Sequence, residues 1–392
     1  MTAHIGRLQA IGLGKESTPG TPVAATVWIP KIQAEFMPEF EKATDDSAYG
    51  VIDEIYDTQT VKNMTKVSVN GIVRDNWIGN MFMATMGDHT LCKFMTILNF
   101  AAGTPARGDT ISSVAGSWSG TIRKVLIISA VTYYLVEITS GTYSDQTDVT
   151  NGTWTGGDSV EKTAVKAHLF TRLNTNSHPS YTFYGSDPVG DEYSAYVMMD
   201  SFEMELGSGD YVKFTSAWQG KQLVTASAQS PAYSSDNVFL AKHAEVYFGD
   251  AEDDLNAATA STIERFKFSV AKNLEAVQAL GSDDVDSFYN KQFGVTGDLE
   301  GLYSDTVFRE YVADSTKKAA RVALINTAAT ALVAGVYPSI FVDFMRFSFT
   351  EWSRSSDNNG LVRQTMGFTG EYSNNESATM EIVLLNSNGS SY

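Results

Sequence analysis

One stretch occurs twice in this chain of 392 residues. The first copy, YVKFTSAWQGK, spans 211–221, and the second, LVRQTMGFTGE, spans 361–371. Large apolar side chains alternate with smaller or polar ones in step in the two copies, as expected of a strand with one buried face. The gapless match indicates a repeated strand. If other segments repeat in the same order, the chain contains two copies of one fold.

Further segments match in the same order along the chain. Each pair has the same type of pattern: extended alternation, a tripeptide ending in glycine, helical spacing of apolar residues, then extended alternation again. The sequence therefore predicts two tandem copies of one β-fold, joined near 227–236. The matched pairs are 34–42 with 264–272, 69–71 with 295–297, 75–86 with 305–312, and 197–206 with 341–349.

Each copy is expected to contain one short helix. The first, over 75–86, has apolar residues at helical spacing and Asp75 as its predicted N-cap. The second is expected over 305–312. The repeating unit is thus strand, strand, short helix, strand, strand. Helix should account for less than a fifth of a mainly β protein.

The first copy carries an insertion. The stretch from Gly71 to Asp200 is much longer than the matching stretch from Gly297 to Asp343. The extra residues should lie mostly in 100–166, where Gly, Ser and Thr surround short β-branched runs. Within it, 124–131 and 133–139 are predicted to form a hairpin. We interpret the insertion as a small all-β domain.

These patterns divide the chain into four parts. Residues 1–30 are punctuated by Gly, Pro and Thr and are expected to form an extended arm that packs on the rest of the fold or on a neighbouring subunit. The predicted divisions are the arm at 1–30, the first repeat at 31–99 and 167–230, the inserted domain at 100–166, and the second repeat at 231–392.

Composition excludes several classes of function. The formal net charge of −18 and the lack of a dense Lys/Arg patch argue against gripping a phosphate backbone. Cys92 is the single cysteine, so an intrachain disulfide framework is excluded and a reducing compartment is expected. The N-terminus lacks the apolar run of a signal peptide. The apolar stretch 322–342 is interrupted by polar residues, which favours a packed loop or hairpin over a membrane span.

The sequence shows no catalytic constellation, and we predict no catalytic, cofactor-binding or metal-binding residue. The GLGK at 12–15 fails the P-loop template. The acidic runs 250–254 and 282–286 do not follow a calcium-loop spacing and are expected to be solvated turns. No histidine has a neighbour at zinc-ligand spacing, and each is expected to be a satisfied or exposed side chain; the five are His4, His89, His168, His178 and His243. Three glycosylation-type sequons, at Asn63, Asn151 and Asn375, carry little meaning without a secretion signal.

A duplicated, acidic chain made of β-strands is expected to assemble with copies of itself. Strand edges offer pairing surface unless something covers them. Two similar units in one chain create head-to-tail contacts, which close into rings when the rotation permits. Stacked rings form a tube, and an acidic tube wall would leave nucleic acid mobile inside it. The residues alone therefore lead to a ring or tube subunit.

Several segments resemble a known family. The opening IGLGKESTPGTPVAATVWIP, the MPEFEK that follows soon after it, and NTNSHPSYTFY at 174–184 followed by YVMMDSFEMEL and YVKFTSAWQGK are similar to major tail tube proteins of long-tailed, siphovirus-type bacteriophages. The resemblance covers 1–100 and 168–227, and the second copy weakly. It implies a β-sandwich or barrel with a flanking helix, assembled into rings that stack into the conduit for genome delivery.

The resemblance also implies partners and a location. The family's usual subunit carries one such fold in a hexameric ring, so a duplicated chain would form trimeric rings with pseudo-sixfold symmetry. Expected partners are other copies of the chain in a helical tube, the tape measure, terminator and distal tail proteins, and double-stranded DNA passing through without sequence-specific binding. The protein would sit in the virion tail, after assembly in the host cytoplasm, without membrane insertion and without a cofactor.

Within such a tube, the insertion would decorate the outside. Segments 40–66 and 270–293 are our candidates for contacts with the next ring, and the arm would brace a neighbour. Two alternatives stay open at this stage. The first is another virion β-protein, such as a decoration or baseplate-hub protein. The second is a carbohydrate-binding or hydrolytic protein, suggested by Trp118 and Trp154 in the insertion.

Overall fold

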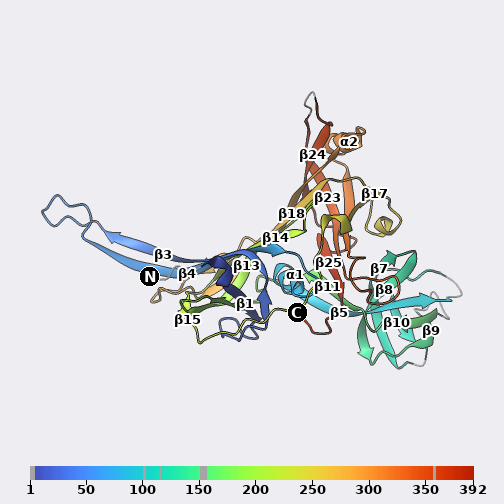
Figure 1. Cartoon of the computed structure of the whole chain (residues 1–392), viewed down its shortest axis with the longest axis horizontal. Coiled ribbons are helices and arrows are strands. Elements are labelled where there is room, and N and C mark those ends of the chain that lie inside the picture. The colour runs from blue at the N-terminus through green and yellow to red at the C-terminus, as the bar shows by residue number, and fades with distance from the viewer. Residues whose placement is uncertain (1–4, 100–102, 115, 151–156, 356–358) are drawn as a thin grey trace.

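The computed structural model describes residues 5–99, 103–114, 116–150, 157–355 and 359–392. Within them the protein is mainly antiparallel β, with two short α-helices, as the sequence predicts. Figure 1 shows an elongated molecule: a long hairpin projects at one end and the insertion lies at the other. The described 3-10 segments are η1 (Gly6–Leu8), η2 (Ala241–His243) and η3 (Asp253–Asn256).

One continuous antiparallel sheet runs through the centre of the molecule. Its eight strands pair in the order β3, β4, β14, β13, β18, β21, β24 and β23. Two long hairpins in each half of the chain supply these strands, so the sheet joins the halves without a break. The bounds are β3 Lys31–Asp45, β4 Asp57–Ile72, β13 Asp191–Gly207, β14 Lys213–Gly220, β18 Arg265–Ala271, β21 Gly294–Leu302, β23 Ser339–Ser355 and β24 Arg363–Gly370.

The core lies on one face of this sheet. Period-two alternation sends the aromatic and methionine side chains of β13 and β14 inward, including Phe202, Phe214 and Trp218. Gly297 and Gly71 make room for this packing, because a Cβ on Gly297 would meet the Phe368 ring at 2.4 Å and one on Gly71 would meet the Phe214 ring at 2.8 Å. The two matched tripeptides, 69–71 and 295–297, are thus places where a neighbouring aromatic ring packs directly against the backbone of a glycine.

A further layer pairs with the first half of β13 and of β23. On one side the pairing order is β2, β1, β12, β13 and β15; on the other it is β17, β16, β22, β23 and β25. The two sets have the same pattern of neighbours in the same chain order. The bounds are β1 Ala10–Lys15, β2 Val27–Ile29, β12 Tyr181–Ser186, β15 Val224–Thr225, β16 Ala244–Gly249, β17 Ala260–Ser261, β22 Lys317–Ile325 and β25 Met380–Asn386.

The pairing registers match in detail where the sequence repeat is clearest. Met199 lies opposite Trp218, and Phe349 lies opposite Phe368. In both hairpins the register shifts immediately after that pair, as in a β-bulge. Strands β14 and β24 therefore correspond as the repeated stretch predicts.

The other sequence matches identify the correct pairs of strands, but they align residues that do not occupy equivalent positions in the strand pairing. The pairing puts Thr350, rather than Asp343, in the position of Asp200. It also puts Gly301, rather than Gly297, in the position of Gly71, since each pairs with the corresponding residue of β14 or β24. The slip from Gly297 to Gly301 is even, and an even slip preserves an alternation with a period of two, so it escapes detection in the sequence. The slip from Asp343 to Thr350 is odd, and the alternation does not explain it.

Both expected helices are present, with shorter bounds. Helix α1 spans Ile78–Met86 and α2 spans Val307–Ala313. The N-cap of α1 is Trp77, without a side-chain cap, so the prediction of Asp75 is wrong. The Asp75 carboxylate instead accepts hydrogen bonds from the backbone and side-chain amides of Asn237, at 2.8 and 2.6 Å. It therefore ties the start of the helix to the joining segment.

The described part of the predicted arm belongs to the fold of its own chain. Strand β1 pairs with β12 and β2 pairs with β1. The buried Glu16 carboxylate fixes this segment, accepting hydrogen bonds from Ser180 Oγ at 2.7 Å, Thr182 Oγ1 at 2.8 Å and the Tyr196 N–H at 2.9 Å. This pairing agrees with one of the two expectations for residues 1–30, packing on the rest of the fold, while a contact with a neighbouring subunit stays a prediction. Short strands separated by Gly, Thr and Pro gave too little periodic signal to predict it.

The insertion forms a closed β-barrel. Its pairings run from β5 to β8, β7, β6, β9, β10 and back to β5. Closure leaves no free strand edge in the ring. Because β5 begins at Gly87, the barrel extends outside 100–166. The bounds are β5 Gly87–Leu98, β6 Thr110–Ser113, β7 Trp118–Ile128, β8 Val131–Gly141, β9 Gln146–Thr150, β10 Gly157–Glu161 and β11 Lys166–Arg172.

Two predicted hairpins are confirmed. Strands β7 and β8 turn at Ser129 and Ala130, whose φ angles of 51° and 62° are those of a tight hairpin turn. The apolar stretch 322–342 is a hairpin of β22 and β23 packed in the core. In the described chain no helix is long and apolar enough to cross a membrane.

A buried network of charges fastens the barrel to the second half of the chain. Lys124 of β7 is fully buried, and its Nζ lies 2.5 Å from Asp343 Oδ2, 3.0 Å from Glu252 Oε1 and 3.4 Å from Glu381 Oε2. Arg321 adds a bond of 2.7 Å to the other oxygen of Asp343. Glu252 of the acidic run 250–254 therefore lies inside this network, so the expectation of a solvated turn is wrong for Glu252, whereas the other residues of the run are exposed.

The network holds its members in their charged forms. Burial alone would lower the pKa of Lys124, but Asp343, Glu252 and Glu381 outweigh it and raise that pKa. Burial would raise the pKa of Asp343, but Arg321 and Lys124 lower it to about 2. Removing one partner would leave buried charges without compensation, which is the costly case for a buried ion pair.

We expect Lys124→Met to lower the unfolding free energy by about 3–5 kcal/mol, because three carboxylates lose a shared partner. The matched control is Lys93→Met. Lys93 pairs with Glu161 but keeps 39% of its side-chain surface exposed, so its loss should cost less than about 1 kcal/mol. Urea denaturation of both variants checks this. Equal effects would contradict a fastening role for the network.

Candidate assembly surfaces

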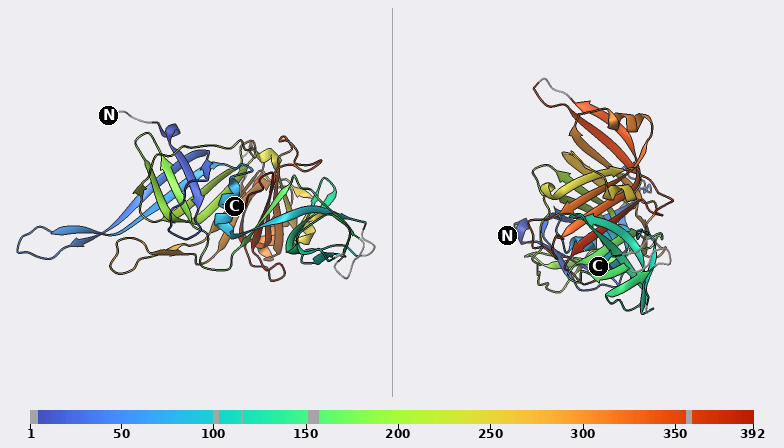
Figure 2. Two further views of the ribbon diagram at one scale, coloured as in Figure 1. Left: turned by 90° about the horizontal axis from the view of Figure 1, so that it is seen from below. Right: turned by 90° about the vertical axis from the view of Figure 1, so that its right-hand side faces the viewer.

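The central sheet ends in two free strand edges. Strand β3 pairs with β4 along one edge, and no described strand pairs with its other edge. At the opposite end, residues 349–355 of β23 pair with β24 alone among the described strands. A long free edge is a template for pairing with another chain. Figure 2 shows these ends as the outer parts of the molecule.

Within the chain, two strands from different halves already pair edge to edge in this way. Strand β13 of the first half pairs with β18 of the second half from Ser201 opposite Ala271 to Gly207 opposite Arg265. Two ion pairs cross this junction: Lys267 to Glu203 and Arg265 to Glu205, each 2.9 Å between nitrogen and oxygen. The free part of β23 corresponds to the half of β13 used here, and β3 corresponds to β18. The two free edges are thus the same two kinds of edge that meet inside the chain.

A groove beside the free edge of β3 supports this correspondence. It has a volume of about 530 Å³ and is lined by residues of β1, β3 and the turn after β12, including Ile11, Phe36 and Asp187. The matching groove beside β18 has a volume of about 170 Å³, and Leu206 and Gly209 at the end of β13 line it. The end of β13 and the turn after it thus border the groove beside β18 and narrow it, whereas no described strand borders the outer side of the groove beside β3.

The solvent face of the central sheet is polar with its charges paired. Besides the two ion pairs at the junction, Arg265 lies 2.7 Å from Asp298, and Arg363 lies 2.7 Å from Glu264. Between them stand small hydroxyl and amide side chains such as Thr215 and Gln219. Cations so compensated offer little attraction to a phosphate backbone.

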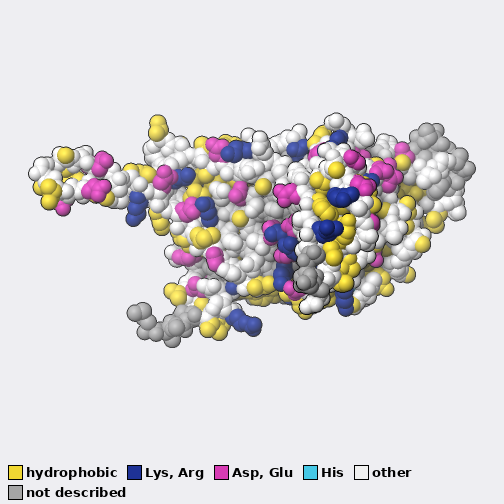
Figure 3. All heavy atoms as spheres, turned by 90° about the horizontal axis from the view of Figure 1, so that it is seen from above, with side chains coloured by type: hydrophobic (Ala, Val, Ile, Leu, Met, Phe, Trp, Pro, Cys, Tyr) yellow, Lys and Arg dark blue, Asp and Glu magenta, His cyan; other side chains and the backbone are white. Residues whose placement is uncertain are grey.

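The hairpin of β3 and β4 projects well beyond the rest of the fold. Figure 3 shows hydrophobic and acidic side chains together at its tip. Ile52 is fully exposed, and Tyr49 stacks on Tyr56 with ring centroids 4.1 Å apart. Exposed apolar groups on a projecting hairpin are typical of an interaction site rather than a core. The acidic residues of the tip are Asp45, Asp46, Asp53, Glu54 and Asp57.

The corresponding segment of the second half, 270–293, behaves differently. It forms the small hairpin of β19 (Glu275–Val277) and β20 (Ser287–Tyr289), which folds back on the first half. Leu274, Val285 and Phe288 pack there against Met64 of β4 and Met198 of β13. The run 282–286 is part of this contact, since Asp284 accepts a hydrogen bond from Gln222 at 3.1 Å. Apart from its exposed tip at Leu280, this segment makes an intramolecular contact.

Most side chains that could serve catalysis or ligand binding have structural roles instead. Trp118 is 2% exposed and donates to the Ser144 carbonyl at 3.1 Å, so it offers no flat surface to a sugar; Trp154 and Asn151 lie outside the described residues. Burial raises the pKa of Cys92 to about 12. Of the GLGK motif, Gly12 and Gly14 lie in β1 under Trp28 and Ala24. No group of three potential metal ligands occurs in the part of the chain that the structure describes.

Two histidines that are far apart in sequence form a stacked pair. His89 Nε2 lies 3.0 Å from His168 Nδ1, and His168 Nε2 lies 2.9 Å from the Asn388 carbonyl oxygen. Tyr392 packs edge-on against the His168 ring. The pair joins β5, β11 and the C-terminal tail. No spacing signal in the sequence could reveal it, because β-pairing alone brings the strands together. His178 and His243 are separately buried, and His4 lies outside the described residues.

This pair makes stability depend on pH. Burial, followed by His168 and Lys15, lowers the pKa of His89 to about 4, and burial lowers that of His168 to about 4. A folded-state pKa below the unfolded value of about 6.5 means that the unfolded chain binds protons first. We therefore expect the unfolding free energy to fall between about pH 6.5 and pH 4. Thermal unfolding across this range, with His89→Gln showing a weaker slope than the parent chain, is the check; equal slopes would exclude the pair as the source.

The comparisons with known proteins agree with a tube-forming role. A family model described as phage tail tube protein matches residues 6–375, nearly the whole chain. No curated protein matches the chain. The match spans both halves of the central sheet and the inserted barrel. The chain belongs to the phage tail tube protein family, as a structural component of a bacteriophage tail.

Proposed function

We propose that this chain is the tail tube subunit of a long-tailed phage, and that three copies form a ring with pseudo-sixfold symmetry. Stacked rings would form the conduit for the genome. The observation that carries the proposal is the central sheet: it already joins two similar units edge to edge, and it ends in the same two edges, unpaired.

The proposal rests on reading the chain as two copies of one unit. The first copy would consist of β1 to β4, α1 and β12 to β15, and the second of β16 to β18, β21, α2 and β22 to β25. The same pattern of neighbours in the same chain order supports this reading. The inserted segment then lies between α1 and β12, beginning with β5. Three chains would supply six units to a ring.

Ring closure would repeat the internal junction between chains. Residues 351–355 of β23 would pair with β3 of the next chain. Register transferred from the junction puts Ser353 opposite the next chain's Met37, as Glu203 lies opposite Ser269 within the chain. The same placement would bring the end of β23 over the open groove beside β3, as the end of β13 covers the groove beside β18.

One departure from the internal junction is informative. Pro38 of β3 takes the position of Val270 of β18, by the registers of their hairpins. Proline has no N–H to donate, and it is tolerated on an edge strand. The intermolecular ladder would therefore lack one hydrogen bond. Such an edge is also a poorer template for unwanted pairing before assembly.

The polar face of the sheet would line the channel. Its compensated ion pairs and small polar side chains suit the passage of DNA without binding, since few free cations are there to hold phosphates. The inserted barrel, at the end of the molecule away from the long hairpin, would lie on the outside of the tube (Figure 1). Other tail proteins would bind the ends of the tube.

Cysteine cross-linking tests ring closure. In Ser353→Cys/Met37→Cys, the two thiols should form a disulfide between neighbouring chains, because directly opposed residues have Cα atoms within disulfide range. Mild oxidation of assembled protein should give covalent trimers on a non-reducing gel. The native Cys92 is buried and should not react.

The control for this experiment is Ser353→Cys/Gln33→Cys. It carries the same number of thiols, but the second lies four residues along β3, beyond the reach of a disulfide. Equal cross-linking in both variants would contradict the proposed register. Covalent hexamers from the first variant would still indicate a ring, but they would contradict a ring of three chains.

The hairpin of β3 and β4 is our proposed contact between stacked rings. Replacing residues 46–56 with a two-residue turn removes the exposed apolar tip without touching a buried residue. We expect rings to form while tubes become short or absent, as seen by negative-stain electron microscopy. Ile127→Ser, which changes an exposed apolar residue of the barrel, is the control and should leave tube length unchanged. Normal tubes from the shortened hairpin would contradict this role.

A further inference from the structure

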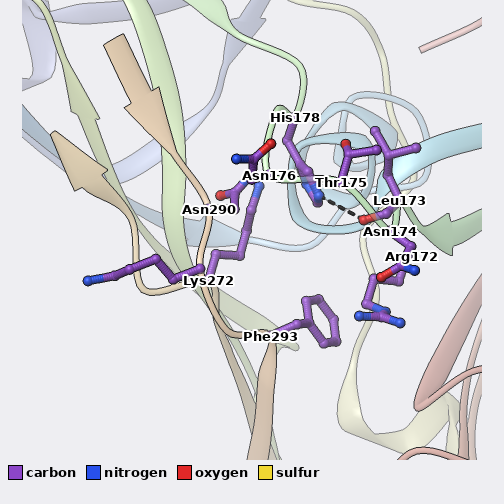
Figure 4. A pocket seen from close by; sticks show the side chains of 10 residues that line it. Arg172, Leu173, Asn174, Thr175, Asn176, His178, Lys272, Asn290 and Phe293 are labelled. Atoms are coloured by element: carbon purple, nitrogen blue, oxygen red, sulfur yellow. Dashed lines mark hydrogen bonds between the residues drawn. The ribbon is translucent and has the colours of Figure 1, made fainter. Parts of the chain in front are cut away.

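A small cavity lies where the base of the insertion meets the second half of the sheet (Figure 4). Its volume is about 210 Å³. Loop 172–178 forms one side, and the ends of β18 and of the 272–293 segment form the other. Neither the ring contact nor the channel face includes it.

The lining has an unusual charge for this chain. Three cationic side chains line the cavity, and no carboxylate is among the lining residues, although the whole chain has a formal net charge of −18. Arg172 lies over the Phe293 ring at 5.9 Å and over Tyr372 at the same distance, and makes no ion pair within 4.0 Å among the described residues. Lys291 pairs at the rim with Glu275, at 3.2 Å. The third cation is Lys272.

Lys272 is buried without a close counter-ion. It is 2% exposed, and its Nζ donates to the Ala84 carbonyl at the end of α1, at 2.6 Å. Burial lowers the pKa of Lys272 to about 7, against a smaller raising effect of Asp200. The Asp200 carboxylate itself accepts from the Leu274 N–H at 2.8 Å. An ammonium group that has only one neutral acceptor would form a stronger, charge-assisted hydrogen bond with an anion in the cavity.

The cavity also contains a polar side chain without a partner. Asn290 is 8% exposed, and neither its amide nitrogen nor its amide oxygen has a hydrogen-bond partner among the described residues. Its backbone N–H donates to the Asn176 carbonyl at 3.0 Å, so its position is fixed. Figure 4 shows the Asn290 amide beside Lys272 at the wall of the cavity. Buried amides are normally satisfied, so this one calls for a ligand.

We propose that this cavity binds a small oxyanion of the phosphate class, held by Arg172, Lys272 and the side-chain amide of Asn290. Three N–H donor groups around a space of this size match the acceptor-only surface of such an ion. The bound ion would join the loop at the base of the insertion to the 272–293 segment. It would thereby brace the insertion against the sheet, independently of ring closure.

Titration calorimetry with inorganic phosphate tests the proposal. The full-length chain is kept at low concentration, at fixed ionic strength, with sodium chloride as the reference salt. We expect saturable one-site binding of phosphate and a rise of the melting temperature with phosphate concentration. Asn290→Ala and Arg172→Gln should each weaken binding at least tenfold, since each loses a hydrogen bond to a charged group.

Both variants should fold without phosphate, because among the described residues the Asn290 side chain has no hydrogen-bond partner and Arg172 has no ion-pair partner. Their melting temperatures in chloride establish this. Arg123→Gln is the matched control: Arg123 is a half-exposed arginine of the barrel, and phosphate affinity should stay within twofold of the parent chain. No saturable phosphate binding, or equal affinity in the parent chain and both cavity variants, would overturn the proposal.

Discussion

The pairing of β13 with β18 is the interaction on which the rest of this structure depends. It turns two groups of four strands into one sheet, and everything else is arranged around that sheet. Antiparallel pairing has a strict requirement: the two edges must present complementary N–H and C=O groups in register. A chain that satisfies this requirement between its own halves, and repeats the pattern of those halves, ends in edges that can satisfy it again. In the proposed ring, assembly would require no new kind of contact.

The long hairpin and the barrel differ in how much strand edge and apolar surface they leave exposed. The barrel closes on itself and leaves no edge in its ring, and a buried charge network around Lys124 fixes it to the second half of the chain. The hairpin does the opposite, since it carries exposed apolar groups such as Ile52 away from the core. Closed, fastened modules tolerate an external position. Exposed apolar groups on a rigid projection are suited to a partner.

The sequence could predict much of the architecture because its strongest signals are local. Alternation in 211–221 and 361–371 identifies strands, helical spacing identifies two short helices, and Gly71 and Gly297 mark places where aromatic rings cross the backbone. The register of the repeat around Gly71 was lost, since a slip by an even number of residues leaves an alternating pattern unchanged. The strands within 1–30 were not predicted because β1 and β2 are short, and only the pairing of β1 with β12 and of β2 with β1 makes them strands.

The sequence by itself determined that the chain is mainly β with two short helices, because composition and periodicity are properties of neighbouring residues. Tertiary structure alone decided which edges stay free, that Glu252 is buried with Lys124 rather than solvated, and that His89 stacks on His168. It also gathered Arg172, Lys272 and Asn290 around one cavity. These residues are far apart along the chain, and only strand pairing between distant segments brings them together.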